Sequence, residues 1–270
     1  MKNKTAIIMS GGGMTCSYGV GSLLALVKKY KLKNPAIVIA GSGSAGTLAY
    51  FVAQQYDVIL NIWSNLLSTK EFIDPLRISK VVDIDYLIDE VFKKQATLNE
   101  KKIRASKILH LIPATNVETG KVTYFSTKNG IDVFEAMRAS KAMPVLFNKK
   151  VCIRGKQYCD SYISTSTKLN ALKAIKLGAT KVIIIDNTTP HLINRFLFFA
   201  WFNLRNKNFK KNYLKNLEKI NETNFPSNVQ MIYLKPEKKL KISMLDNSRR
   251  ALGELTSPGY TKPVPKRVAF

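Results

Sequence analysis

The chain has 270 residues, 46% of them hydrophobic, and carries a formal net charge of +25 at pH 7. This length and apolar content suit one α/β-sized domain with a sizeable core and exclude a disordered chain. Its three cysteines are odd in number and lack a CxxC spacing, so we expect no disulfide framework, no metal site and an intracellular protein.

Short apolar runs alternate with amphipathic stretches along the chain. The runs predict strands over 4–9, 36–40, 108–112, 122–125, 182–185 and 229–234. Helical periodicity predicts helices over 19–30, 44–56, 133–140 and 169–177. This alternation indicates an α/β fold whose mostly parallel sheet is covered on both faces. No repeat or linker marks a boundary, so we expect one domain over 1–270, with a basic C-terminal extension from about 191.

Two glycine-rich turns follow the first two predicted strands. The first is Gly11-Gly12-Gly13 and the second is Gly41-Ser42-Gly43-Ser44-Ala45-Gly46. The second lies in the strand, sharp turn, helix context of a nucleophile elbow, which predicts Ser44 at the apex. Two such turns can place a serine hydroxyl beside free backbone N–H groups, as acyl transfer requires.

The second turn also has other interpretations. Gly41, Gly43 and Gly46 satisfy G-x-G-x-x-G, but a dinucleotide site needs an acidic residue at the end of the next strand, and 58–63 does not supply one. A purely structural glycine turn, in which Ser44 caps the following helix, stays open as well.

The chain contains two histidines that could serve as a base. His110 lies among apolar residues of a predicted strand, which favours a packed side chain. His191 follows Asp160 in the Ser, Asp, His order of an α/β-hydrolase triad. In that fold several strands precede the elbow, whereas only one predicted strand does here, so a histidine triad is disfavoured.

Ordered motifs continue through the rest of the chain. They are Ala114-Thr115-Asn116-Val117-Glu118-Thr119-Gly120-Lys121, Arg138-Ala139-Ser140-Lys141-Ala142-Met143-Pro144-Val145-Leu146-Phe147, Tyr158-Cys159-Asp160-Ser161-Tyr162, Lys235-Pro236-Glu237 and Gly259-Tyr260. Together with Ser10-Gly11-Gly12-Gly13-Met14 and Ser42-Gly43-Ser44-Ala45-Gly46, they resemble the bacterial patatin-like phospholipase family over nearly the whole chain.

The resemblance implies a three-layer αβα sandwich and a lipid acyl hydrolase of the phospholipase or lysophospholipase type. It implies a Ser44 and Asp160 dyad that needs no metal or cofactor, with Ser44 forming the acyl-enzyme and Asp160 acting as general base. The elbow would comprise Ser42, Gly43 and Gly46 around Ser44. The oxyanion hole would be formed by backbone N–H groups of Gly11, Gly12, Gly13 and Met14.

Three positions depart from the family pattern. Thr15-Cys16 stands where Arg-Gly is usual, Ser161 replaces the glycine after the dyad aspartate, and Ser42 replaces the first glycine of the elbow. Side chains at such positions restrict the backbone. A catalytically silent lipid-binding or scaffold protein is therefore the alternative function, and Asp160 would then be a loop carboxylate that caps a turn.

The positive charge predicts attraction to polyanions. No zinc-finger, RNP-like or helix-turn-helix pattern supports specific nucleic-acid binding, which leaves it a less favoured alternative. The segment 192–215 joins aromatic residues to lysines and suits contact with an anionic membrane, although a core helix with a basic exit is the competing interpretation. We expect a cytoplasmic protein that can associate with membranes, without a signal peptide or transmembrane helix.

Overall fold

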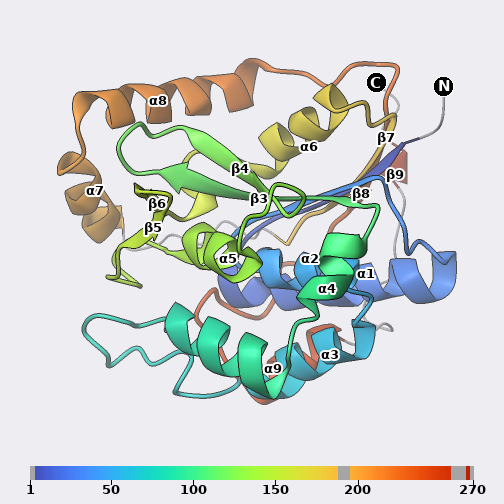
Figure 1. The fold of residues 1–270 in the computed structure, drawn as a ribbon, viewed down its shortest axis with the longest axis horizontal. Helices are drawn as coiled ribbons and strands as arrows, with labels where there is room; N and C mark the ends of the chain where they lie inside the picture. The colour runs from blue at the N-terminus through green and yellow to red at the C-terminus, as the bar shows by residue number, and fades with distance from the viewer. Residues whose placement is uncertain (1–3, 188–194, 257–265, 268–270) are drawn as a thin grey trace.

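A computed structural model describes residues 4–187, 195–256 and 266–267, and a mixed sheet runs through its centre (Figure 1). The middle of the sheet is parallel. Its strands stand in the order β3 (Leu109–Asn116), β2 (Ile37–Ala40), β1 (Thr5–Met9), β7 (Lys181–Ile185) and β8 (Gln230–Leu234). The predicted strands of this central group are confirmed, with β3 longer than expected.

The sheet ends in antiparallel strands on both sides. β4 (Val122–Ser126) and β6 (Lys156–Cys159) both pair with β3, and β5 (Val151–Ile153) extends the sheet beyond β6. On the other side β9 (Lys266–Arg267) pairs with β8. The β5–β6 hairpin was not predicted from the sequence. It turns at Arg154 and Gly155, whose φ values of 50° and 74° suit the tight turn that connects antiparallel strands.

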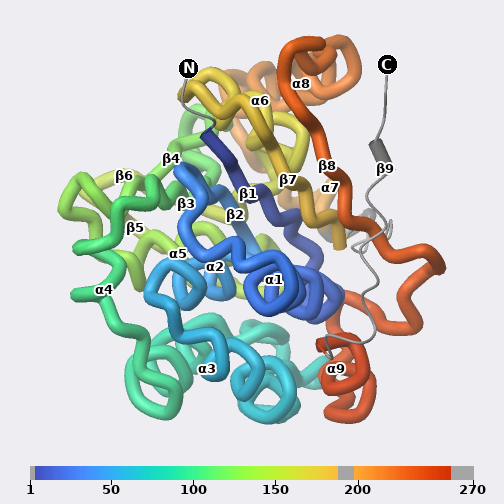
Figure 2. The backbone as a smooth tube through the Cα atoms, turned by 90° about the vertical axis from the view of Figure 1, so that its right-hand side faces the viewer, coloured from blue at the N-terminus to red at the C-terminus, as the bar shows by residue number. Residues whose placement is uncertain are grey.

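Helices cover both faces, as predicted. Ala6 and Ile8 of β1 pack toward α6 (Thr167–Lys176), whereas Ile7 and Met9 pack into the larger core under α1 (Cys16–Tyr30) and α2 (Ser44–Val52). Figure 2 shows α6 and α8 (Lys207–Glu222) on one side of the sheet and α1, α2 and α5 (Val133–Lys141) on the other. The side chains of β1 therefore alternate between two apolar layers, which gives an αβα sandwich.

The larger helical layer is thicker than the sequence indicates. The predicted helix over 44–56 ends early, and after Gln54, at φ 58°, the chain re-enters a helix as α3 (Tyr56–Asn61). Further helical segments are η2 (Ile62–Leu66), η3 (Tyr86–Gln95), α4 (Glu100–Ala105) and α9 (Arg249–Thr256). Figure 1 shows α3 and α9 on the far side of α1 and α2 from the sheet. An outer layer of helices thus encloses the space over α2.

Residues after 195 pack onto the same body. In α8, Asn212 donates to Thr119 O over 2.9 Å, while Lys168 of α6 donates to Ile220 O over 2.7 Å. In α9, Leu252 is fully buried. The helix α7 (Arg195–Asn203) lies beside α8 (Figure 1). The expected extension from about 191 begins outside the described residues; α8 contacts the β3–β4 turn, whereas β8 belongs to the central sheet.

The winding of the sheet determines where a site can form. From β1 the chain proceeds to β2 and β3 on one side and, later, to β7 and β8 on the other. In such sheets the loops at the carboxyl ends of the strands separate at the point where the order reverses, and a crevice forms there. The loops after β1 and β2 are the two glycine-rich turns.

Candidate active site

The glycine-rich loop after β1 carries backbone donors at the switch point. Gly12 and Gly13 have φ values of 135° and 58°, which favour glycine. Among the described residues, the Gly12 and Gly13 N–H groups have no acceptor, whereas the Met14 N–H donates to Met244 O over 3.0 Å. The donors open to a ligand in this loop are therefore those of Gly12 and Gly13, and Met14 is already bonded.

The turn after β2 has its apex at Ser42. Ser42 has φ 51°, Gly43 returns to φ −51° and ψ −40°, and α2 begins at Ser44. A side chain on Gly43 would lie 2.8 Å from Gly13 O and 2.7 Å from Cys16 Sγ. The glycine at 43 thus lets the elbow pack directly against the glycine-rich loop. The structure therefore differs from the predicted apex at Ser44: the positive φ of the turn lies at Ser42, and Ser44 is the first residue of α2.

Ser44 instead belongs to a buried hydrogen-bond network. Its Oγ donates to Ser10 O over 2.7 Å, and Asn187 Nδ2 donates both to Ser44 Oγ over 3.3 Å and to Ser10 O over 2.9 Å. The Ser44 side chain is fully buried. Its contacts join the ends of β1 and β7 to the start of α2.

The sequence motif fits either serine. An elbow needs small residues two positions before and two after its apex, and Ala40 and Ser44 meet this requirement around Ser42 as well as Ser42 and Gly46 do around Ser44. The signal that could have identified Ser42 is the place where the strand ends. Since β2 ends at Ala40, only Gly41 separates Ser42 from the strand.

Asp160 lies beside the elbow, as the order of motifs predicts. It follows β6, and its Oδ1 accepts the Tyr162 N–H over 2.9 Å, while Oδ2 is buried without a hydrogen-bond partner. Burial raises the pKa of Asp160 to about 6, against the lowering effects of the Tyr162 N–H, the Ser42 hydroxyl and the Lys141 charge. The Ser42 hydroxyl is thus close enough to influence the carboxyl, although no hydrogen bond joins them here.

The departures at Cys16 and Ser161 impose no backbone strain. Cys16 has φ −63°, and Ser161 is not among the residues with positive φ. Neither position therefore needs the freedom of glycine. Ser161 lies against Gly41, and Tyr162 packs over Gly11, so the turn after Asp160 closes onto both glycine-rich turns.

Lys141 is a site residue that sequence reasoning missed. It ends α5, is 6% exposed, and its Nζ donates to Ser42 O over 2.7 Å and to Gly43 O over 3.0 Å. Burial lowers the pKa of Lys141 to about 8, while Cys16 and Asp160 act in the opposite direction. Nothing in the local sequence distinguishes this lysine from the surface lysines around it.

A cavity with mainly apolar walls opens beside Ser42. It is a narrow slot, with a cavity volume of about 60 Å³. Its lining includes Gly13, Ser42, Gly43, Thr47, Ile62, Trp63, Leu87, Phe92, Lys141, Met143 and Phe147. The polar lining groups lie at the elbow, and the remaining, apolar part of the lining suits an aliphatic chain.

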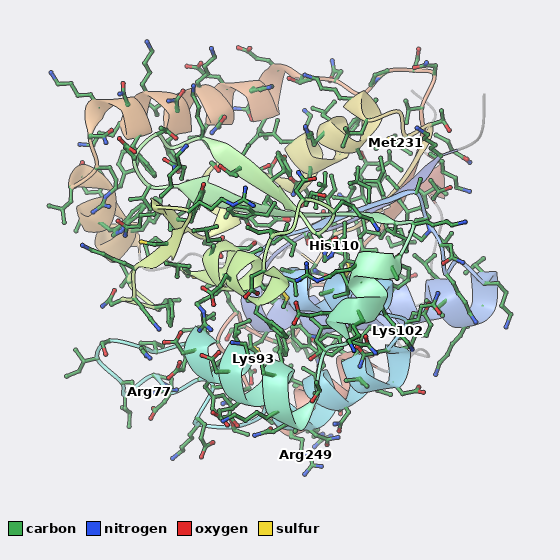
Figure 3. All side chains as sticks on the ribbon, viewed as in Figure 1. Arg77, Lys93, Lys102, His110, Met231 and Arg249 are labelled. Atoms are coloured by element: carbon green, nitrogen blue, oxygen red, sulfur yellow. The ribbon has the colours of Figure 1, made fainter. Side chains whose placement is uncertain are left out.

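His110 does not line this cavity. His110 is fully buried in β3 and neither ring nitrogen has a partner, and burial lowers its pKa to about 4. Figure 3 shows it near the middle of the view, whereas the labelled Arg77 and Arg249 lie toward the edge of the molecule. His191 falls outside the described residues. Within the described ranges, no three His, Cys, Asp or Glu side chains gather as a metal site.

Comparisons with known proteins indicate a family and a fold. The sequence model of the family described as "Patatin-like phospholipase" matches residues 7–172, more than half of the chain. The fold is similar to the crystal structure of VipD from Legionella pneumophila, with a TM-score of 0.53 and 14% sequence identity. That match covers 96% of this chain and 65% of VipD, so the chain spans less than two thirds of VipD. No curated protein sequence matches significantly.

Proposed function

The chain belongs to the patatin-like phospholipase family, and on that premise we propose that it hydrolyses fatty acyl esters of phospholipids or lysophospholipids through Ser42 and Asp160. Membership supports lipid acyl hydrolysis in general. The observation that carries the finer assignment is a positive-φ serine and the unpaired Gly13 N–H in the lining of an apolar slot, with the buried Asp160 carboxyl close to that serine.

The first half of the proposed reaction forms an acyl-enzyme. Asp160 accepts the Ser42 proton as Oγ bonds to the ester carbonyl carbon, and the carbonyl oxygen becomes an oxyanion that receives the Gly12 and Gly13 N–H groups. Each preorganised donor contributes about 3 kcal/mol to the transition state. The carbon–oxygen bond to the leaving alcohol then breaks, and the alcohol takes the proton from Asp160.

The second half releases the acid. Water gives a proton to Asp160 and bonds to the acyl carbon, and the tetrahedral oxyanion again uses the donors of the glycine-rich loop. The bond to Ser42 Oγ breaks, the fatty acid leaves, and Asp160 returns its proton to Ser42. A carboxyl with a pKa of about 6 is a better base than an ordinary aspartate and is still mostly ionised at pH 7.

Fatty-acid release with matched variants tests this assignment. We expect turnover of phospholipid or lysophospholipid by the wild type, and its loss in Ser42→Ala and Asp160→Asn. Ser44→Ala is the control, because Ser10 O keeps its bond from Asn187 Nδ2 when the Ser44 hydroxyl is removed. Loss in Ser44→Ala with retention in Ser42→Ala would assign the nucleophile to Ser44. No turnover by the wild type would favour a silent lipid-binding protein.

We propose, second, that α7 and the start of α8 contact anionic membranes. Phe198, Trp201 and Phe202 pack against one another and against the buried Phe209, so they form the core of this helical corner. Phe199 is instead 62% exposed. Leu204 is 78% exposed, and the cations beside it are Arg205, Lys207, Lys210 and Lys211. Apolar side chains beside lysines suit the lipid interface. Among the described helices, none is both long and apolar enough to cross a membrane.

Vesicle binding tests this second proposal. The double change Phe199→Ser and Leu204→Ser should weaken binding to anionic vesicles by about tenfold or more, since burying each side chain contributes about 1.5–3 kcal/mol. Tyr30→Ser, at another exposed aromatic residue at the end of α1, is the matched control and should bind as the wild type does. Equal binding by all three proteins would reject the assignment.

A further inference from the structure

The buried ammonium of Lys141 has an unusual pair of partners. It donates to the carbonyl oxygen of Ser42, at the apex of the elbow, over 2.7 Å, and to that of Gly43, just before α2, over 3.0 Å. Among the described residues that line the cavity it is the sole cation. Removing a charge from water is costly unless strong hydrogen bonds replace its hydration. The cost of burying this cation therefore suggests that Lys141 has a function at the elbow.

The other cation of α5 serves a different part of the fold. Arg138 forms ion pairs with Asp85, Asp89 and Glu135, on the side of α5 that faces η3. Lys141 has no described ion pair. Its neighbours of opposite charge act at longer range, and the ionisable groups that face it are Cys16 of α1 and Asp160 after β6.

One of the two bonds of Lys141 ends on strained backbone, at Ser42. A non-glycine residue at positive φ is strained, and such strain persists only where the surroundings fix the conformation. Ser42 holds that conformation, with its N–H on Ser140 and its carbonyl on Lys141. The same ammonium places a positive charge near the Asp160 carboxyl, where it favours the ionised form.

We propose that Lys141 is a positioning residue that fixes Ser42 at the elbow apex and keeps Asp160 ionised, so that the site is competent only while Lys141 is protonated. This inference rests on the proposed hydrolase function. Lys141 acts through two other groups: the backbone that aims the nucleophile and the carboxyl that accepts its proton. Cys16 contributes little charge in the working range, because burial raises the pKa of its thiol to about 11.

The activity should depend on pH in both the acidic and the alkaline range. Activity should rise as Asp160 ionises near pH 6 and fall as Lys141 loses its proton near pH 8. Lys141→Met lacks the positive charge, so the pKa of Asp160 rises and the acid limb moves to higher pH. The alkaline limb at Lys141 disappears in this variant. Lys141→Arg stays charged, and its alkaline limb should move well above pH 8.

The experiment measures fatty-acid release from a lysophospholipid between pH 5 and 10. In Lys141→Met we expect kcat to fall about tenfold or more, which corresponds to about 1.4 kcal/mol of transition-state stabilisation, with KM nearly unchanged. In Lys141→Ala, added propylammonium replaces the atoms removed and should restore part of the rate. Lys149→Met is the matched control, because that lysine is exposed and bonds Asp85.

The outcomes separate this proposal from the proposed function. Loss of turnover in Ser42→Ala supports the hydrolase whatever Lys141 does. A folded Lys141→Met protein with the wild-type kcat and pH profile would overturn the role of Lys141. If the wild type shows no turnover, the carboxyl carbon of Asp160 is titrated by NMR. A raised Asp160 pKa in Lys141→Met supports the electrostatic contact, and an unchanged one overturns it.

Discussion

Replacing Asp160 by asparagine should stabilise the fold above pH 6 while abolishing activity. The folded-state pKa of about 6 exceeds the value of about 3.9 for an unperturbed aspartate. A group with a raised pKa contributes stability at low pH and loses it as the pH rises through the folded value. The folded and unfolded pKa values differ by about two units, and each unit corresponds to 1.36 kcal/mol. Ionised Asp160 therefore lowers the free energy of unfolding by about 3 kcal/mol at pH 8.

Urea denaturation at pH 4 and pH 8 measures this difference. In the Asp160→Asn variant the side-chain amide oxygen can accept the same Tyr162 N–H that Asp160 Oδ1 accepts now. We therefore expect a free energy of unfolding close to the wild-type value at pH 4 and about 3 kcal/mol higher at pH 8. An equal effect at both pH values, or destabilisation at pH 8, would refute the reasoning that burial strains the ionised carboxyl.

Three further changes test the elbow, the core and the cavity. Gly43→Ala forces a methyl group to within 2.8 Å of Gly13 O, so it should lower the activity and reduce the free energy of unfolding by about 1–3 kcal/mol. Gly253→Ala is the control, because a methyl group there meets open space and should lower neither quantity. Arg138→Met removes one partner of Asp85, which keeps Lys80 and Lys149, and should destabilise the fold by about 1.5–3 kcal/mol in urea denaturation. Ile62→Phe narrows the slot and should shift fatty-acid release toward shorter acyl chains.

The layer arrangement could be predicted because its signals are local. The apolar runs at 4–9, 36–40 and 182–185 are short, buried on both faces and followed by glycine or polar residues, as central parallel strands require. The helices that pack on them show clear periodicity. The order of motifs likewise predicts that Asp160 lies near the glycine-rich turns.

Other features depend on tertiary structure. Two overlapping patterns fit the elbow, and only the backbone geometry, with positive φ at Ser42, separates Ser42 from Ser44. Lys141 is one lysine among many in the sequence, and its burial follows from how α5 packs against the elbow. In 192–215 the aromatic residues could be read as lipid-facing or core-facing, and packing divides them: Phe202 turns inward and Phe199 outward.

Covalent labelling of the nucleophile tests the central claim most directly. A fluorophosphonate reacts with an activated serine and stays attached, so intact mass and peptide mapping identify the modified residue. We expect one adduct per chain, located on Ser42, present in Ser44→Ala and absent in Ser42→Ala and Asp160→Asn. An adduct on Ser44, or labelling that persists in Ser42→Ala, would contradict the account.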